Sequence, residues 1–334
     1  MKKTLSTFIL ALFLYADPAL AFKLATGSFT GNVTDDRTVD ISDTSSPTVA
    51  DFQPDAVIVK CDSANHAVFK TSSMAGDSAT QMGVGQTALI ANLIQSFSSV
   101  GFVIGSDSRA NASGATCHYV AFATDANNDL SVGSYTGNAT DPTDIVISPA
   151  FSPQFCMVVE DADTTPDAGS WVTTNFTADS TGNFDASAND ANAVQAWNAD
   201  GFEIGSHTRI NELNSTFYYL CLKAVTGYTK VGNFTGNGTS QSLSSFGFQP
   251  QVVFIKGNSA TAATGLKTPT QTTDTTCRTD SATCGTGRIT IDADGFSVGS
   301  STTANESAVV MQYFAFKAPV YSGGVRPIVP IIFQ

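Results

Sequence analysis

The chain repeats one hexapeptide three times, as Gly27-Ser-Phe-Thr-Gly-Asn32, Gly133-Ser-Tyr-Thr-Gly-Asn138 and Gly232-Asn-Phe-Thr-Gly-Asn237. Three further signatures follow each copy in the same order: a Phe-x-Pro, a Gly-Phe and an apolar segment that opens with Tyr. They are Phe52-Gln-Pro54, Phe151-Ser-Pro153 and Phe248-Gln-Pro250; Gly101-Phe102, Gly201-Phe202 and Gly295-Phe296; and Tyr119-Val-Ala-Phe122, Tyr219-Leu-Cys-Leu222 and Tyr313-Phe-Ala-Phe316. A period near one hundred residues exceeds the ~20–50 residues of solenoid repeats, so it predicts tandem domains.

Each repeat alternates apolar and polar residues between turns that are rich in Gly, Asn and Asp. This pattern predicts an all-β protein of three tandem β-sandwich, jelly-roll-like domains, spanning residues 22–126, 127–226 and 227–318. Residues 86–97 have the best helical period, and we interpret them as strand with room for a short helical insert. Because the connections are short, we expect the domains to touch and to form a stubby rod.

Residues 1–21 have the features of a cleaved signal peptide. Lys2 and Lys3 form the basic start, an apolar run follows, and Ala19-Leu-Ala21 is a small-residue cleavage site. The apolar run is shorter than the ~20 residues of a membrane span, and no other stretch approaches that length. We therefore expect a mature chain without a membrane span, secreted to the cell surface or beyond rather than kept in the periplasm.

The charge balance is acidic and sparse. Without residues 1–21 the chain keeps 14 basic and 28 acidic residues, a net charge of −14. Nucleic acids and anionic membranes would repel such a protein, so neither is an expected partner. Charged residues make up only 13% of the sequence, against about 25% in an average soluble protein. Few lysines guard the strand edges, which favours lateral association.

The six cysteines fall two to a repeat, which in an exported protein indicates disulfides. Cys156 and Cys221 align with Val57 and Ala121 of repeat one. If those strands are antiparallel with Val57 opposite Ala121, the same register places Cys61 opposite Cys117. The third pair, Cys277 with Cys284, closes a tight loop, and no Cys-x-x-Cys knuckle supports zinc instead. We predict three disulfides within the repeats, although two cysteines in each repeat can also arise by chance.

The sequence offers no catalytic constellation. His66, His118 and His207 occupy unlike positions in the repeats, and no nucleophile elbow, zinc helix or phosphate loop is present. We therefore expect a protein that is not an enzyme and needs no cofactor. Paired carboxylates for glycoside hydrolysis stay open as an alternative, because their separation of ~5–10 Å is not visible in a sequence. Asp125, Asn127 and Asp129 alternate like calcium ligands but lack the Gly and Glu that complete an EF-hand. Asp and Asn also form turns readily, and this is the interpretation that we favour; a structural calcium stays the weaker alternative.

Glycan binding is the second function that the sequence permits. Trp171 and Trp197 align with apolar residues in the other repeats, so we assign both to the core rather than to sugar stacking. A sugar would have to bind the loops at 161–169 or 260–273, where the copies differ most.

An apolar tail, residues 319–334, follows the third repeat after a Gly323-Gly324 hinge. Its apolar residues are Val325, Ile328, Val329, Ile331, Ile332 and Phe333. The tail can fold back on repeat three, or it can dock on a neighbouring molecule and build a filament. Pro327 and Pro330 restrict it to an edge or an extended conformation.

The copies resemble a β-sandwich repeat of secreted bacterial surface proteins and phage tail proteins. The shared pattern is an aromatic-Thr-Gly-Asn opening, a Gly-Phe-Gln-Pro strand entry followed by Val-x-Ile-Lys, an Asp-Gly-Phe hairpin and a Tyr-x-Ala-Phe close. Residues 246–256 fit it well, whereas repeat two departs most, with Phe151-Ser-Pro153 and with Glu160 at the lysine position. The resemblance implies a surface-exposed β module without assigned catalytic residues.

Together these features predict an exported structural or adhesive surface protein, which self-associates as an extracellular filament subunit through its tail. A glycan-binding surface module is the alternative.

Overall fold

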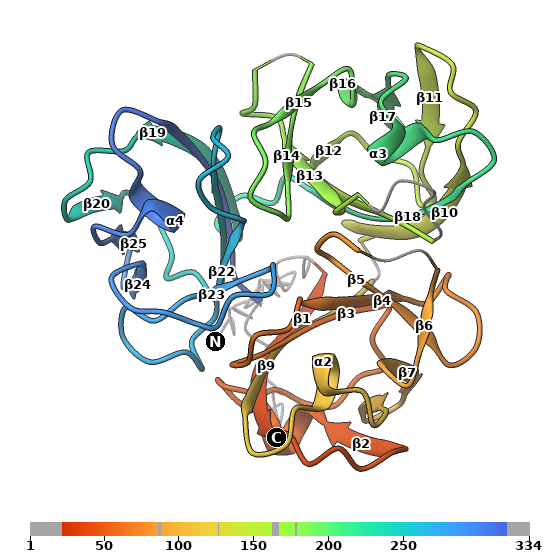
Figure 1. The fold of residues 1–334 in the computed structure, drawn as a ribbon, viewed down its shortest axis with the longest axis vertical. Helices are drawn as coiled ribbons and strands as arrows, with labels where there is room; N and C mark the ends of the chain where they lie inside the picture. The colour runs from red at the N-terminus through yellow and green to blue at the C-terminus, as the bar shows by residue number, and fades with distance from the viewer. Residues whose placement is uncertain (1–21, 86–87, 126, 162–166, 178, 319–334) are drawn as a thin grey trace, which may run out of the picture.

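The structure is a computed structural model, and it describes residues 22–85, 88–125, 127–161, 167–177 and 179–318. The chain is nearly all β, and its strands fall into three sets with a common order (Figure 1). We call these sets repeats one, two and three. Each has a large sheet and a three-stranded sheet, which confirms the all-β sandwich fold. Among the described residues, no helix has the length and apolar character needed to cross a bilayer.

Repeat one begins with a strand that pairs with the closing strand of its large sheet. Its elements are β1 (Lys23–Thr30), β2 (Arg37–Asp40), α1 (Ile41–Thr44), β3 (Ala56–Cys61), β4 (Val68–Thr71), β5 (Ser78–Gln81), β6 (Ile90–Ala91), β7 (Ile94–Ser98), β8 (Gly101–Ile104), α2 (Ser108–Asn111) and β9 (Thr116–Ala123). The large sheet has the order β1-β9-β3-β4-β5-β6, and the small one β2-β8-β7. Residues 88–97 are turn and strand, so the described part of 86–97 forms no helix.

Repeat two has the same order, with sheets β10-β18-β12-β13-β14-β15 and β11-β17-β16. Its elements are β10 (Leu130–Thr136), β11 (Thr143–Val146), β12 (Pro153–Glu160), β13 (Ser170–Thr173), β14 (Ser180–Asn183), β15 (Asp190–Ala191), β16 (Val194–Asn198), β17 (Gly201–Ile204), α3 (Thr208–Asn211) and β18 (Thr216–Lys223).

Repeat three has sheets β19-β26-β21-β22-β23 and β20-β25-β24. Its elements are β19 (Thr229–Thr235), β20 (Gln241–Ser244), β21 (Val252–Gly257), β22 (Gly265–Lys267), β23 (Cys277–Arg278), β24 (Ile289–Asp292), β25 (Gly295–Val298), α4 (Thr302–Asn305) and β26 (Val310–Phe316).

The first glycine of each repeated hexapeptide makes room for a tyrosine ring of the closing strand. Gly27 pairs with Tyr119, and a Cβ on this glycine would lie 2.3 Å from the tyrosine ring. Tyr219 and Tyr313 cover Gly133 and Gly232 in the same way. Each ring therefore packs over a strand position that has no side chain of its own, which explains why the opening and the close are repeated together.

The closing strands are apolar because both of their faces are buried. On β9, Tyr119 and Ala121 face the interior of their own sandwich, whereas Val120 and Phe122 belong to a second hydrophobic cluster. That cluster joins residues from all three repeats. Phe155 of repeat two stacks on Phe314 of repeat three at 4.5 Å between ring centroids, and Phe122 lies 5.7 Å from Phe316.

The three large sheets thus surround one aromatic core, and the repeats form a closed ring (Figure 1). The predicted rod is wrong. The central strands of the large sheets are apolar on the face that packs inside their own sandwich and also on the opposite face, and this second face must be covered too. The boundaries predicted near 126 and 226 both fall between strands. Since the repeats share a core, their division into independently folding domains stays a prediction.

Hydrogen bonds close the ring at equivalent positions, at the start of β4, β13 and β22 and at the end of β5, β14 and β23. Ala67 N donates to Thr279 O (2.9 Å), linking repeats one and three, and Gly169 N donates to Met82 O (3.0 Å), linking two and one. Repeats two and three join through Thr264 Oγ1, which donates to Asn183 O (2.8 Å). Residues 212 positions apart in the sequence are therefore direct hydrogen-bond partners.

The structure confirms the three predicted disulfides, Cys61–Cys117, Cys156–Cys221 and Cys277–Cys284. It also confirms the register behind the first two: Val57 lies opposite Ala121, Cys61 opposite Cys117 and Cys156 opposite Cys221. The same register corrects one assignment. Val159, opposite Tyr218, occupies the position of Lys60 and Lys256, whereas Glu160 aligns with Cys61.

Candidate functional site at the junction of repeats one and three

The side chain after each Phe-x-Pro proline binds the chain beyond the closing strand, directly after that strand in repeats one and three and at the start of β19 in repeat two. Asp55 accepts from Thr124 N (2.7 Å), Gln154 Oε1 accepts from Thr229 Oγ1 (2.9 Å), and Gln251 Oε1 accepts from Ala318 N. After repeats one and two, the outgoing chain crosses to the next repeat, and Val225 in the second link packs on the central core. Repeats three and one have no such covalent link, so the ring closes there through non-covalent contacts.

A cavity of about 980 Å³ lies at this junction. Residues 46–50 of repeat one form one wall, and repeat three forms the rest together with Ala318. The apolar lining consists of Pro47, Val49, Ala50, Pro250, Pro269, Ile291 and Ala318. The polar lining consists of Ser46, Thr48, Gln249, Gln251, Lys267, Gln271, Thr273, Thr290 and Lys317. The size is that of a ligand cleft, typically about 300–1,000 Å³.

Lys267 shapes one wall of the cavity rather than offering a free amine. Its Nζ donates to the carbonyls of Gln271, Thr273 and Thr275 at 2.7–2.9 Å, which curls residues 268–275 around it. Burial lowers the pKa of Lys267 to about 8. Lys70 binds the carbonyls of Gly76 and Ser78 in the same way. The ammonium groups of these lysines therefore satisfy backbone carbonyls of the loop that follows each of them, which is a structural role.

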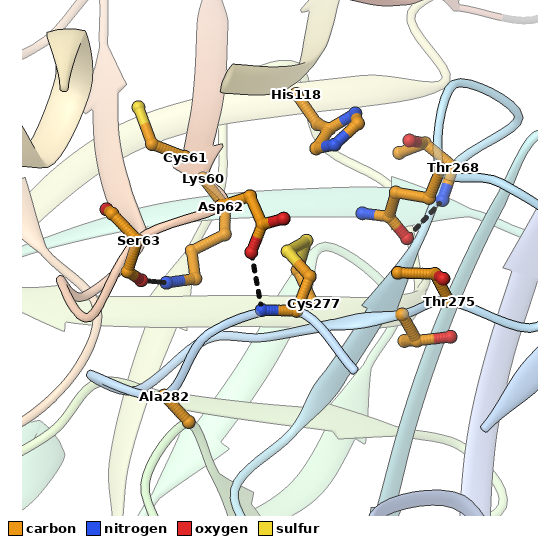
Figure 2. The surroundings of a disulfide bond; sticks show 12 residues. Lys60, Cys61, Asp62, Ser63, His118, Thr268, Thr275, Cys277 and Ala282 are labelled. Carbon is orange, nitrogen blue, oxygen red and sulfur yellow. Dashed lines mark hydrogen bonds between the residues drawn. A yellow bond between two sulfur atoms is a disulfide. The ribbon is translucent and has the colours of Figure 1, made fainter. Parts of the chain in front are cut away.

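The seam beside the cavity is polar (Figure 2). Asp62 Oδ1 accepts from Cys284 N at 3.0 Å, so the Cys277–Cys284 loop of repeat three is held by repeat one. His118 Nδ1 lies 2.7 Å from Thr270 Oγ1, in the loop that Lys267 curls. Burial lowers the pKa of His118 to about 4, with the positive charge of Lys267 acting in the same direction. His118 is therefore a neutral hydrogen-bonding partner between the repeats.

The other ionic cluster fixes loops of repeat two. Arg209 is 8% exposed, and its guanidinium lies 2.8 Å from Asp190, 3.5 Å from Asp167 and 3.7 Å from Asp185. It also donates to Ala168 O (3.1 Å). A buried charge needs such partners, and here they hold the loops around α3.

The predicted calcium ligands are used differently. Asp125 Oδ1 accepts from Asn127 N (2.9 Å), which is an Asx turn, and Asp129 pairs with Lys223 at 3.6 Å. Burial raises the pKa of both carboxyls. Among the residues that the structure describes, no group of three or more His, Cys, Asp or Glu side chains is placed to hold a metal ion.

The remaining sequence predictions fall on different parts of the structure. Trp171 is buried, donates to Thr264 Oγ1 (2.9 Å) and belongs to the central core, as predicted; Trp197 is half-buried. Of the two variable loops, 260–273 supplies Pro269, Gln271 and Thr273 to the cavity. Residues 162–166 of the other loop, the signal peptide and the tail residues Val325, Ile328, Val329, Ile331, Ile332 and Phe333 lie outside the described residues.

Sequence reasoning missed one repeated residue, the buried asparagine at 111, 211 and 305. In repeat two, Asn211 Nδ2 donates to Thr140 O (2.9 Å) and Gly205 O (2.7 Å), and Oδ1 accepts from Asn138 N (2.8 Å). It thus fixes the Thr-Gly-Asn loop against the Gly-Ser turn. The signal was present, since each asparagine follows the repeated Gly-Ser glycine by six residues.

A family model described as a domain of unknown function, DUF7483, matches residues 24–267. The chain belongs to this family. The DUF7483 match covers repeats one and two and ends with β22, so Thr290, Ile291 and Lys317 of the cavity lie beyond it. The comparison with curated proteins found no match.

Proposed function

We propose that this protein is an exported structural or adhesive protein of the cell surface, which self-associates when its C-terminal segment docks on a neighbouring copy. One observation carries the proposal: the three repeats close into a ring within a single chain. A head-to-tail interface that closes on itself cannot also build an open polymer. The interfaces between the repeats are therefore already used within one chain, and a contact between copies needs other residues. The sequence after Ala318 offers apolar residues for that contact.

The ring has the properties that an extracellular building block needs. Its disulfides span separations of 56, 65 and 7 residues, and its core joins all three repeats. The ionic groups at the seam and around α3 hold loops together. They therefore support a framework role better than a catalytic one.

The test compares mature protein, residues 22–334, with a variant that ends at Ala318. We expect concentration-dependent polymers of the longer protein in size-exclusion chromatography and negative-stain microscopy, and monomers of the shorter one. Circular dichroism and thermal melting of both proteins control for folding. Monomers of both proteins at every concentration would refute the proposal.

An oligosaccharide screen on the same samples addresses the glycan alternative. The described lining of the cavity contains no aromatic ring on which a sugar could stack. Saturable binding of an oligosaccharide by a monomer would nevertheless favour a glycan-binding module over self-association.

A further inference from the structure

We infer that the cavity between repeats one and three is the binding site of the chain's own C-terminal segment, residues 325–334. The inference goes beyond the proposed function, because it holds whether or not the protein assembles.

The path of the chain gives the first argument. Ala318 occupies the position of Thr124, and the backbone N–H of each is bound by the residue after the Phe-x-Pro proline. After repeats one and two, the chain continues across the junction to the next repeat. After repeat three, the equivalent junction leads to repeat one, and Ala318 lines the cavity there. The ring therefore directs the outgoing chain into this site.

The lining gives the second argument. Pro47, Pro250 and Pro269 form an apolar wall without N–H donors, suited to β-branched and proline side chains. The segment to be placed has Pro327 and Pro330 among Ile and Val. Such a sequence is restricted to an extended conformation with few N–H groups to satisfy. The apolar side chains of the segment therefore match the apolar wall of the cavity.

A buried donor gives the third argument. Gln271 is 3% exposed and lines the cavity. Its Oε1 accepts from Thr268 N (3.3 Å), but its Nε2 has no acceptor among the described residues. Buried amide donors rarely lack a partner, because losing water without a new hydrogen bond is unfavourable. A backbone carbonyl of the docked segment would supply the acceptor.

The linker is long enough. Residues 319–324 can span up to roughly 20 Å at about 3.3 Å per residue, and they start at the cavity wall. A linker as short as six residues holds its segment at an effective concentration in the millimolar range, so binding within the chain precedes binding to a neighbour. In an assembly the same segment would exchange into the identical cavity of another copy, as in domain swapping.

The test places one cysteine in the cavity and one in the tail of the mature full-length chain, Ala50→Cys with Ile332→Cys. Ala50 is exposed, and all six native cysteines are disulfide-bonded, so the new thiols are the only free ones. The matched control is Leu213→Cys with Ile332→Cys, since Leu213 is 60% exposed and lies in repeat two, outside the cavity. Both proteins are oxidised mildly at low concentration and mapped by mass spectrometry.

We expect a disulfide between positions 50 and 332 within monomers, formed at least about tenfold faster than the 213–332 control because of the higher local concentration. Adding Gln271→Leu, which removes the donor, should lower the rate of the 50–332 link. Cross-linked dimers without cross-linked monomers would overturn the inference, while supporting docking on a neighbour. Equal rates for both pairs would overturn it too, and the truncation experiment would still decide the proposed function separately.

Discussion

At the scale of single residues, the buried asparagines hold the loops of each sandwich. Asn211 is fully buried, and its side-chain amide makes four hydrogen bonds to backbone groups of two loops. Three of the partners, Asn138, Ala139 and Thr140, lie in the Thr-Gly-Asn loop, and the fourth is Gly205. Replacing Asn211 with alanine leaves these groups without partners. We expect Asn211→Ala to lower the free energy of unfolding by about 2–4 kcal/mol.

The measurement is chemical denaturation, with Asn198→Ala as the matched control. Asn198 donates only an exposed hydrogen bond to Asp144, so its loss should change stability by less than about 0.5 kcal/mol. Similar effects of the two variants would show that Asn211 does not organise the loops.

His118 makes stability depend on pH. Burial lowers its pKa to about 4 in the folded protein, against about 6.5 in the unfolded chain. Below pH 6.5 the unfolded chain binds the proton first, so stability is complete above pH 6.5 and falls as the pH drops towards 4. The loss amounts to about 3 kcal/mol by linkage.

His118→Gln removes the titrating ring and keeps a hydrogen-bonding group, as at the equivalent Gln312. We expect the difference in unfolding free energy between the wild type and this variant to change between pH 6.5 and 4 and to stay constant above pH 7. His66, whose pKa burial also lowers, is present in both proteins and cancels in this difference. A difference that does not vary with pH would contradict the buried, neutral state of His118.

At the scale of elements, the register of the closing strands β9 and β18 is fixed twice, by the side-chain pattern and by a disulfide to the neighbouring strand. Cys61–Cys117 closes a separation of 56 residues, whereas Cys277–Cys284 closes only 7. Chain entropy therefore predicts that removing the first destabilises the protein by about 4 kcal/mol, and removing the last by about 2.5 kcal/mol.

The measurement is the denaturation midpoint of the paired alanine variants. Cys156→Ala with Cys221→Ala is the internal control, because its separation of 65 residues predicts an effect like that of Cys61–Cys117. Equal losses for all three pairs would indicate that strain or packing, rather than chain entropy, sets the contribution of the disulfides.

At the scale of the whole molecule, the shared core couples the repeats. Phe155 contacts Phe254 and Phe314 of repeat three, whereas Phe202 packs inside repeat two against Tyr135 and Tyr219. We expect wild-type protein to unfold in one calorimetric transition. Phe155→Ala should lose about 3–5 kcal/mol and split the transition, because it weakens the link between repeats.

Phe202→Ala is the matched control, since Phe202 is equally buried in the same repeat. It should lower the midpoint to a similar extent and leave a single transition. A split in both variants, or in neither, would show that the central core does not couple the repeats.

The sequence by itself determined the all-β class, the threefold repetition, the strand register and the cysteine pairs. These features follow from local periods and from cross-strand pairs that recur in each copy, such as Val57 opposite Ala121. It also indicated loop 260–273 as a place where the copies differ, but not the partner that completes the cavity there. The buried asparagines were visible in the repeat spacing, although their role needs the loops that they join.

Only the tertiary structure decided that the repeats close into a ring rather than extend as a rod. Apolar residues on both faces of β9 require a cover on the outer face, but they do not specify which sheet supplies it. That choice depends on contacts such as Ala67 with Thr279, which no local pattern encodes. The cavity is a product of the same closure, because its two walls come from the first and the last repeat.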